Sequence, residues 1–248
     1  GAPVLEDLDL GEAGILIQVA GQETAGAVRA CSLHEARVHA IKATDGAAPT
    51  IEENDISDAA GPGIWIDGMS TAPHVRANRI YDGSSGGIVV VNGATPSIED
   101  NEIWEHSKPA ITIVGAGTDP IIRANRLHDG EANGLFIERG ASPVVEDNEI
   151  WEHAKAGISI AGTGTDPVVR GNHVHDGADS GVAIRAGASP RVEDNDIDDN
   201  GGFGVGIGDA GTNPVIRANR ISGGLGGIAV IERAGPRVEA NDVSGTER

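Results

Sequence analysis

Aromatic rings and carboxylates recur along this chain at a spacing that could bring them together on one surface. Five rings follow one another at intervals of 23 or 24 residues, and a carboxylate directly follows each ring. The rings are Tyr81, Trp104, His128, Trp151 and His175, and the carboxylates are Asp82, Glu105, Asp129, Glu152 and Asp176. Rings can cover the apolar faces of pyranoses, and carboxylates accept hydrogen bonds from hydroxyl groups. The pattern predicts an outward ligand-binding stripe, with rings that only shield a bend and solvated turn acids as the alternative.

The carboxylates belong to a longer series that contains no basic residue. Its nine members are Glu12, Glu35, Asp58, Asp82, Glu105, Asp129, Glu152, Asp176 and Asp199. Equivalent carboxylates on adjacent strands would lie about 4.8 Å apart. Because Ca²⁺ takes several oxygen ligands, Asp82, Glu105, Asp129 and Glu152 are candidate Ca²⁺ ligands. We expect no other cofactor.

One irregular stretch, DIDDNGGFGVGIGDAG, offers candidates for acid–base catalysis. It holds Asp198, Asp199 and Asp209 close in sequence to Phe203. Paired carboxylates can act as acid and base, but Asp198 and Asp199 are neighbours in a predicted turn and belong to the repeating series. His106 and His153 occupy matching places two repeats apart, which is too wide a separation for one zinc ion. We interpret both histidines as bend residues.

An asparagine marks the repeat that must position these side chains. It occurs every 22 to 24 residues, with a proline five residues before each one. The markers are Asn54, Asn78, Asn101, Asn125, Asn148, Asn172, Asn195, Asn219 and Asn241. Stepping back by 23 residues leads to Cys31 and Leu8, so we count eleven units. Stacked asparagines can bond to one another and to backbone groups at a bend, which predicts a structural column.

Apolar residues fall at fixed places around each marker. They occur three residues before it and two after it, as at Ile98 and Ile103, and then in a glycine-led alternation such as Gly157-Ile158-Ser159-Ile160. Three short segments of period two, broken by Gly, Asn and Pro, indicate three strands per unit. A unit of 22–24 residues with three strands predicts one coil of a parallel β-helix. The fold class is therefore all-β, a solenoid of about eleven coils forming a single domain over residues 1–248.

Charges alternate between successive units. Two residues before the marker the chain reads Glu and Arg in turn, from Glu6 through Glu99, Arg123 and Glu146 to Glu239. One residue after the marker a second series alternates less regularly, with Arg126, then Glu149, then His173. In a parallel stack each residue faces its equivalents in the adjacent coils, so alternating charges attract. These columns are predicted to fix register.

Composition limits the partners. Aromatic residues make up only 2% of the 248 residues, which suits thin layers of aliphatic side chains. The formal net charge of −20 argues against nucleic-acid binding and anionic-membrane binding. We expect a soluble chain, because no apolar run is long enough for a transmembrane segment and the N-terminus does not read as a signal peptide. The sequence does not indicate a cellular compartment. Acidic residues in both terminal units, Glu6 and Asp9 against Glu239 and Asp242, would disfavour end-to-end stacking, so we expect a monomer.

The stretches NPVIRANRISGG and VVEDNEIWEHAKAGISI resemble the right-handed parallel β-helix repeats of the pectin-lyase-like superfamily. They are most similar to its carbohydrate-binding and sugar-hydrolase repeats, found also in NosD-like proteins and in a β-helix-bearing F-box adaptor. The resemblance covers about residues 3 to 243 and implies a right-handed coil. It also implies a protein that binds or acts on polysaccharides. Separately, the abrupt start of the sequence leads us to expect a fragment or module of a longer protein. Gly-His-Gly and Arg-Ile-Lys, which polygalacturonase-like members carry, do not occur here.

Two functions follow as expectations. The first is a non-catalytic binding or scaffold module, with a polysaccharide or protein ligand along the aromatic and acidic stripe. The second is a polysaccharide-active enzyme, either a lyase or a glycoside hydrolase. Unit lengths differ by at most two residues, which leaves little chain for the loops that would wall an active-site cleft. That regularity favours the binding module.

Overall fold

The computed structural model describes residues 3–22 and 24–245, and its strands form three parallel sheets. The first sheet contains eleven strands. They are β1 (Val4–Glu6), β4 (Ala27–Arg29), β7 (Thr50–Glu52), β10 (His74–Arg76), β13 (Ser97–Glu99), β16 (Ile121–Arg123), β19 (Val144–Glu146), β22 (Val168–Arg170), β25 (Arg191–Glu193), β28 (Val215–Arg217) and β31 (Arg237–Glu239). Every strand pairs with the equivalent strand of the next coil.

The second sheet also has eleven strands, and the third has ten. The second contains β2 (Asp9–Gly11), β5 (Ser32–His34), β8 (Asp55–Ser57), β11 (Arg79–Tyr81), β14 (Glu102–Trp104), β17 (Arg126–His128), β20 (Glu149–Trp151), β23 (His173–His175), β26 (Asp196–Asp198), β29 (Arg220–Ser222) and β32 (Asp242–Ser244). The third contains β3 (Ile15–Ala20), β6 (His39–Thr44), β9 (Ile64–Asp67), β12 (Ile88–Val91), β15 (Ile111–Val114), β18 (Leu135–Glu138), β21 (Ile158–Ala161), β24 (Val182–Arg185), β27 (Phe203–Ile207) and β30 (Gly226–Val230).

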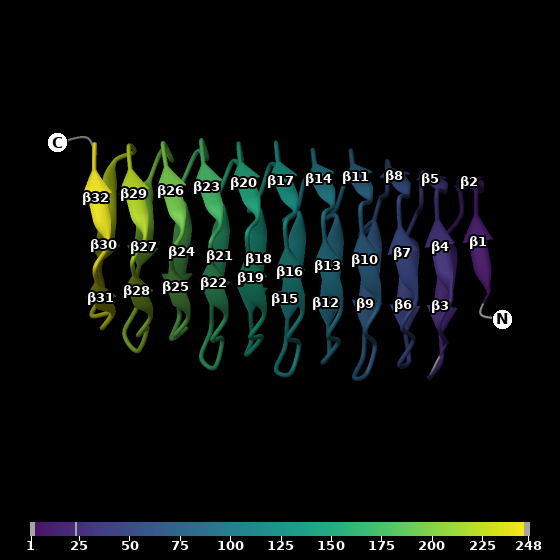
Figure 1. Cartoon of the computed structure of the whole chain (residues 1–248), viewed down its shortest axis with the longest axis horizontal. Helices are drawn as coiled ribbons and strands as arrows, with labels where there is room; N and C mark the ends of the chain where they lie inside the picture. The colour runs from purple at the N-terminus through teal and green to yellow at the C-terminus, as the bar shows by residue number, and fades with distance from the viewer. Residues whose placement is uncertain (1–2, 23, 246–248) are drawn as a thin grey trace.

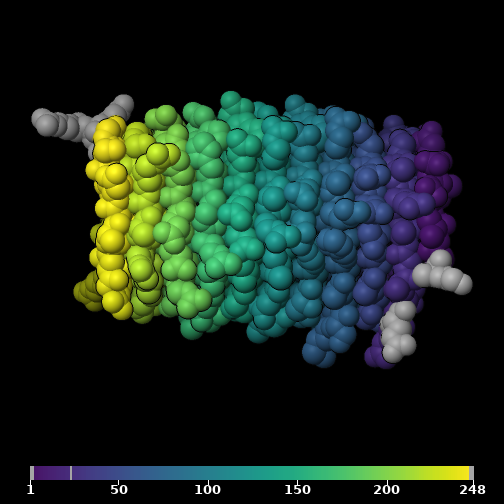
Figure 2. All heavy atoms as spheres, viewed as in Figure 1, coloured from purple at the N-terminus to yellow at the C-terminus, as the bar shows by residue number. Residues whose placement is uncertain are grey.

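The coils stack in sequence order along one axis, so that the two ends of the chain lie at opposite ends of the molecule (Figure 1). In the space-filling view each coil is a thin band beside the next (Figure 2). This is the predicted right-handed parallel β-helix with three strands per coil. Nothing in residues 3–22 and 24–245 forms a helix of the length and apolarity that a membrane crossing needs.

The core is a column of aliphatic side chains that the three sheets enclose. In one coil Ile98, Ile103, Ile111 and Ile113 are all fully buried, and the same positions repeat along the rod. Alternate residues of each strand point outward because successive side chains of a β-strand face opposite sides. The strand pattern therefore fills the interior with branched aliphatic residues and leaves the outer surface to charges and rings.

The predicted asparagine column is confirmed. The Oδ1 atom of Asn148 accepts from the backbone N–H and the side-chain amide of Asn125, both at 2.9 Å. Its own Nδ2 contacts Asn172 Oδ1 at 2.9 Å and the carbonyl of Ile122 at 3.0 Å. At the N-terminal end Cys31 occupies the column, and its backbone N–H donates to Asn54 Oδ1 at 3.1 Å. The column thus satisfies buried polar groups at the bend between the first two sheets.

The alternating charges face one another as predicted. Arg123 is in register with Glu99 on one side and Glu146 on the other. Its Nη2 atom lies 2.9 Å from Glu99 Oε2. In the second sheet Arg126 Nη1 lies 2.7 Å from Glu102 Oε1 and its Nε lies 3.5 Å from Glu149 Oε2. These pairs lie on the solvent side of the sheets.

Candidate functional site

The five predicted rings form one continuous stack along the outer face of the second sheet. Each ring lies on the equivalent ring of the next coil, because Tyr81, Trp104, His128, Trp151 and His175 end successive strands in register. Centroids of neighbouring rings are 4.3 to 5.9 Å apart, and their planes differ by 3° to 14°. Each ring is half-buried.

Stacking determines what these rings can offer to a ligand. Each inner ring has a neighbour over both faces, and Arg79 and Arg126 lie over rings of the stack at 5.2 to 5.7 Å. At the N-terminal end the Tyr81 hydroxyl donates to Asp55 Oδ1 at 2.8 Å. The stack therefore presents ring edges to solvent. A ring that packs on a pyranose must instead expose one of its faces. This arrangement favours packing between coils, and ligand binding along the stack stays a prediction.

The acidic series lies directly beside the rings at a sharp bend. All nine residues, from Glu12 to Asp199, have φ between 49° and 58°. This left-handed conformation turns the chain from the second sheet to the third and leaves the carboxylates exposed. Carboxylates of adjacent coils contact each other in pairs. A hydrogen bond shared with Asp82 raises the pKa of Glu105, and one shared with Asp129 raises the pKa of Glu152.

The structure separates the three aspartates considered for catalysis. Asp198 ends β26 in the second sheet, and its Oδ1 lies 2.9 Å from His173 Nε2. Asp199 is the last member of the acidic series. Asp209 follows β27 of the third sheet, and its Oδ2 accepts from the backbone N–H of Ala186 at 2.8 Å. Asp198 and Asp209 thus belong to different sheets, and each carboxylate already has a partner.

The two histidines lie at a bend, as the sequence predicts, and both are buried. His106 and His153 are 2% and 1% exposed. Burial lowers the pKa of His153 to about 4, so this ring is neutral at pH 7. A Cβ atom on Gly130 would lie 2.6 Å from His153 Nδ1. Glycine in the preceding coil therefore makes room for the imidazole, which explains the alternation of His and Gly.

The third sheet carries a groove that the sequence did not lead us to expect, and we call it the third-sheet groove. It has a volume of about 550 Å³. Trp65, Val89, Thr112 and Phe136, which are in register on β9, β12, β15 and β18, form its floor and ends. Lys108 and Lys155 stand at its side, with Ser85, Ser107, Glu131 and Asn133 among the polar lining residues. The signal that could have found it is two aromatic residues three units apart in one outward column.

A second missed feature lies at the C-terminal end of the ring stack. His173 occupies a place where two coils earlier the chain has Arg126. Among the described residues, two groups of three side chains have donor atoms within 4.8 Å of one another, and both groups include this histidine. The first is Glu149, His173 and His175, and the second is His173, Asp196 and Asp198. Carboxylates of the predicted Ca²⁺ series, by comparison, meet in pairs. The Ca²⁺ site stays a prediction.

Comparison with known proteins gives a family and several similar structures. The model for "Right handed beta helix region" matches residues 13–172 and 164–248. The A-module of the mannuronan C-5 epimerase AlgE4 of Azotobacter vinelandii superposes with a TM-score of 0.79 at 18% identity, covering 98% of this chain and 77% of that one.

Two further solved structures have the same fold. The periplasmic alginate epimerase AlgG gives a TM-score of 0.75 at 13% identity, covering 98% and 77% of the two chains. An alginate lyase of a Paenibacillus species gives 0.61 at 11% identity, covering 98% and 100%. Curated protein sequences give no significant match. At these identities the likeness is one of fold.

Proposed function

The chain belongs to the right-handed β-helix family, and on that premise we propose that it binds an acidic polysaccharide in the third-sheet groove. The observation that carries the proposal is the pairing of aromatic side chains with lysines in one elongated hollow. Sugar-binding sites combine apolar surface with a few well-placed polar groups. The groove has both, and it runs along the rod axis across several coils.

The aromatic residues of the groove are spaced for a chain-like ligand. Trp65 and Phe136 are three coils apart in register, which corresponds to about 14 Å at the usual strand spacing. Val89 and Thr112 fill the two positions between them and are smaller than either ring. Trp65 stacks on His39 with centroids 5.1 Å apart, so its other side is the one that borders the groove.

The lysines indicate the charge of the ligand. The chain has three lysines, Lys42, Lys108 and Lys155, and two of them line this groove. Both are exposed, and within the described residues neither forms an ion pair. In a protein of net charge −20, two free ammonium groups beside one hollow are suited to a carboxylate on the ligand. The names of the similar structures concern mannuronan and alginate, which makes alginate a reasonable first probe.

The ring stack with its acidic series is the alternative location, as the sequence suggests. Its ring edges and carboxylates could bond to sugar hydroxyls, but its covered ring faces and negative charge suit an acidic polysaccharide poorly. A direct comparison of variants distinguishes the two surfaces. Trp65→Ala and the pair Lys108→Gln and Lys155→Gln alter the groove, whereas Trp104→Ala and Trp151→Ala alter the stack.

Calorimetric titration with alginate and polygalacturonate oligosaccharides tests the proposal. We expect each groove variant to weaken binding by about tenfold or more, equivalent to about 1.4 kcal/mol, and the stack variants to bind as the parent does. Loss of binding only in the stack variants would move the site to the stack. Absence of binding to every acidic polysaccharide in the panel would overturn the proposal. Reducing-end and ultraviolet absorbance assays on the same mixtures separate a binding module from a lyase or hydrolase.

A further inference from the structure

The alternating charges of the second sheet are interrupted in two coils, by Ser32 near the N-terminal end and by His173 further along. The residues that follow the marker asparagine read Glu102, Arg126, Glu149, His173 and Asp196 in successive coils, all in register. An imidazole therefore stands where the pattern places a guanidinium. Since His175 follows on the same face of the same strand, β23 presents two imidazoles outward, with a carboxylate on the strand at either side.

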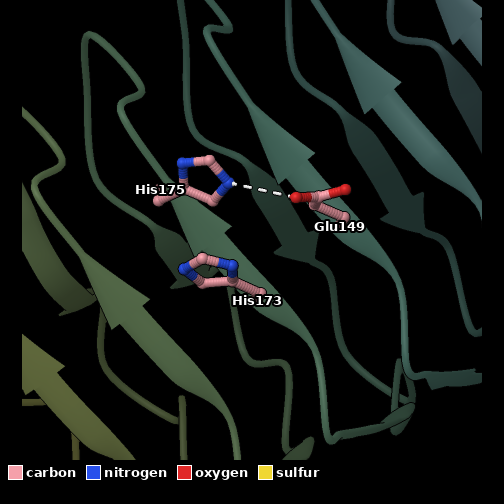
Figure 3. A group of neighbouring side chains, drawn as sticks. All are labelled: Glu149, His173 and His175. Atoms are coloured by element: carbon pink, nitrogen blue, oxygen red, sulfur yellow. Dashed lines mark ion pairs between the residues drawn. The ribbon is translucent and has the colours of Figure 1, made fainter.

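The two imidazoles lie together beside Glu149. Their centroids are 4.1 Å apart with an interplanar angle of 27°. Figure 3 shows that each ring turns one nitrogen toward the side on which the Glu149 carboxylate lies. His175 Nε2 is 3.9 Å from Glu149 Oε1. One donor atom from each of the three side chains falls within 4.8 Å of the other two.

A carboxylate holds the other nitrogen of each ring. Asp176 Oδ2 lies 2.8 Å from His175 Nδ1, and Asp198 Oδ1 lies 2.9 Å from His173 Nε2. A carboxylate on one ring nitrogen fixes the tautomer and directs the lone pair of the other nitrogen outward, which is the usual arrangement around a metal-bound histidine. The nitrogens left free are His175 Nε2 and His173 Nδ1.

His175 Nε2 is available as a ligand atom. This atom is buried and has no hydrogen-bond partner among the residues that the structure describes. Its side chain is 15% exposed. A buried polar atom without a partner costs free energy, and an ion between this nitrogen, His173 and Glu149 would remove that cost.

We propose that Glu149, His173 and His175 bind a divalent transition-metal ion of the Zn²⁺ class. Two imidazoles with one carboxylate suit zinc and its neighbours better than Ca²⁺, which prefers oxygen ligands only. Zinc bonds to nitrogen and oxygen are about 2.0–2.2 Å long, so small side-chain rotations would draw the three donors in from their present separation. Three protein ligands leave a fourth position to solvent. Of the two donor sets we choose this one, because Arg220 Nε lies 2.8 Å from Asp196 Oδ1 in the other, which is a closer contact than the 3.5 Å between Arg126 Nε and Glu149 Oε2 in this one.

The chain contains its own near-copy of this site, two coils earlier. On β17, His128 Nδ1 lies 2.7 Å from Asp129 Oδ2. His128 Nε2 is buried without a partner among the described residues, and it lies 3.6 Å from Glu102 Oε1. Among the three donors the difference is Arg126 at the place of His173, with Nη1 2.7 Å from the same Glu102 oxygen; outside the donor set, Trp151 stands at the place of Asp198. One residue therefore separates a complete donor set from an incomplete one.

Zinc titration of the full chain, with the metal alone and no saccharide, tests the site. We expect one bound Zn²⁺ per chain by calorimetry and a visible d–d spectrum when Co²⁺ is the probe. His173→Arg restores the alternating charges and should weaken zinc binding at least about 100-fold without unfolding the rod. Asp176→Asn, which changes only a positioning residue, should weaken it by about 10–100-fold. Arg126→His should add a second binding event.

Several results would overturn the proposal. Parent protein that binds no zinc, or His173→Arg protein that binds it as tightly as the parent, would each do so. Displacement of the ion by Ca²⁺ at equal concentration would also do so, because it would place the ion on the oxygen-only acidic series. Circular dichroism of each variant establishes that the fold is retained. Failure of this site leaves the polysaccharide proposal untouched, since the two concern different sheets and the titration contains no sugar.

Discussion

The inner asparagine column and the outer charged columns are built by the same repeat but differ in how much they vary. Nine successive coils place asparagine at the marker. In the first eight of them its side chain is buried and bonds to both neighbouring coils, as at Asn148. One residue away on the outside, the same coils place Asp, Glu, Arg or His. Water can replace a partner outside but not inside. Departures from the repeat on the outer surface are therefore the places to look for function.

Asn148→Ala is expected to be the most damaging of the changes that test this comparison. It leaves the buried N–H of Asn125 and the carbonyl of Ile122 without the partners they have at 2.9 and 3.0 Å. At about 1–3 kcal/mol for each group left without a partner, we expect the free energy of unfolding to fall by about 4 kcal/mol in urea denaturation. Asn172 also loses the donor to its Oδ1.

Cys31→Ala is the matched control, because Cys31 occupies the same column in a coil without asparagine. It removes a sulfur atom that lies 3.2 Å from the carbonyl of Arg29 and leaves the backbone bond to Asn54 in place. A thiol is a weak donor, so the loss should be well below that of Asn148→Ala. Equal losses in the two variants would contradict the hydrogen-bonding role of the column.

The fold could be predicted almost completely from sequence, because the same residue types recur at equivalent positions of every repeat. Asn101 and Asn125 share a position, and a parallel stack requires equivalent positions to lie together. The third-sheet groove leaves a weaker signal in the sequence, which is two aromatic residues in one outward column. Trp65 and Phe136 are three units apart, and only the register shows that Val89 and Thr112, the residues between them, are too small to close the hollow.

The ring stack shows where sequence patterns are ambiguous. Spacing places Tyr81, Trp104 and Trp151 in one column, but it does not say whether their faces turn toward solvent or toward one another. The stacked centroids answer that question. The His173 donor set shows the opposite case, since its signal, a single histidine in an alternating series, is visible in the sequence and gains meaning only from the positions of Glu149 and His175.

His153→Asn should have the next largest effect, and it should appear as a change in pH dependence. Burial lowers the pKa of His153 to about 4, from about 6.5 in an unfolded chain. Below pH 6.5 the unfolded chain gains a proton that the folded chain does not, so stability is lost as the pH falls from 6.5 to 4. The parent therefore loses about 3 kcal/mol of its free energy of unfolding over this range, and His153→Asn should remove this loss.

Asparagine is the chosen replacement because the chain already uses it at this place. Asn200 occupies the equivalent position one repeat pair later, where its Oδ1 accepts from Gly177 N–H at 3.1 Å and its Nδ2 donates to the Val174 carbonyl at 2.9 Å. Urea denaturation at pH 7 and pH 4 measures the difference for parent and variant. If both lose the same amount between these pH values, His153 is not a source of the acid sensitivity.

Arg123→Glu tests the outer side of the comparison and should have the smallest effect. It places three acids in register, since Glu99 and Glu146 flank Arg123. The Arg123 side chain is 47% exposed, so water and salt can compensate much of the lost attraction. We expect a lower thermal midpoint at low ionic strength that recovers largely at about 1 M salt, where the screening length is about 3 Å.

Arg123→Gln separates lost attraction from new repulsion, because it removes the charge without adding another. Its midpoint should lie between those of the parent and Arg123→Glu, and it should respond less to salt. If salt does not change the shift in thermal midpoint, the packing of the Arg123 side chain, and not its charge, stabilises this position. The outer columns would then tolerate substitution no better than the inner one, and a single histidine in place of arginine would lose its value as a marker of function.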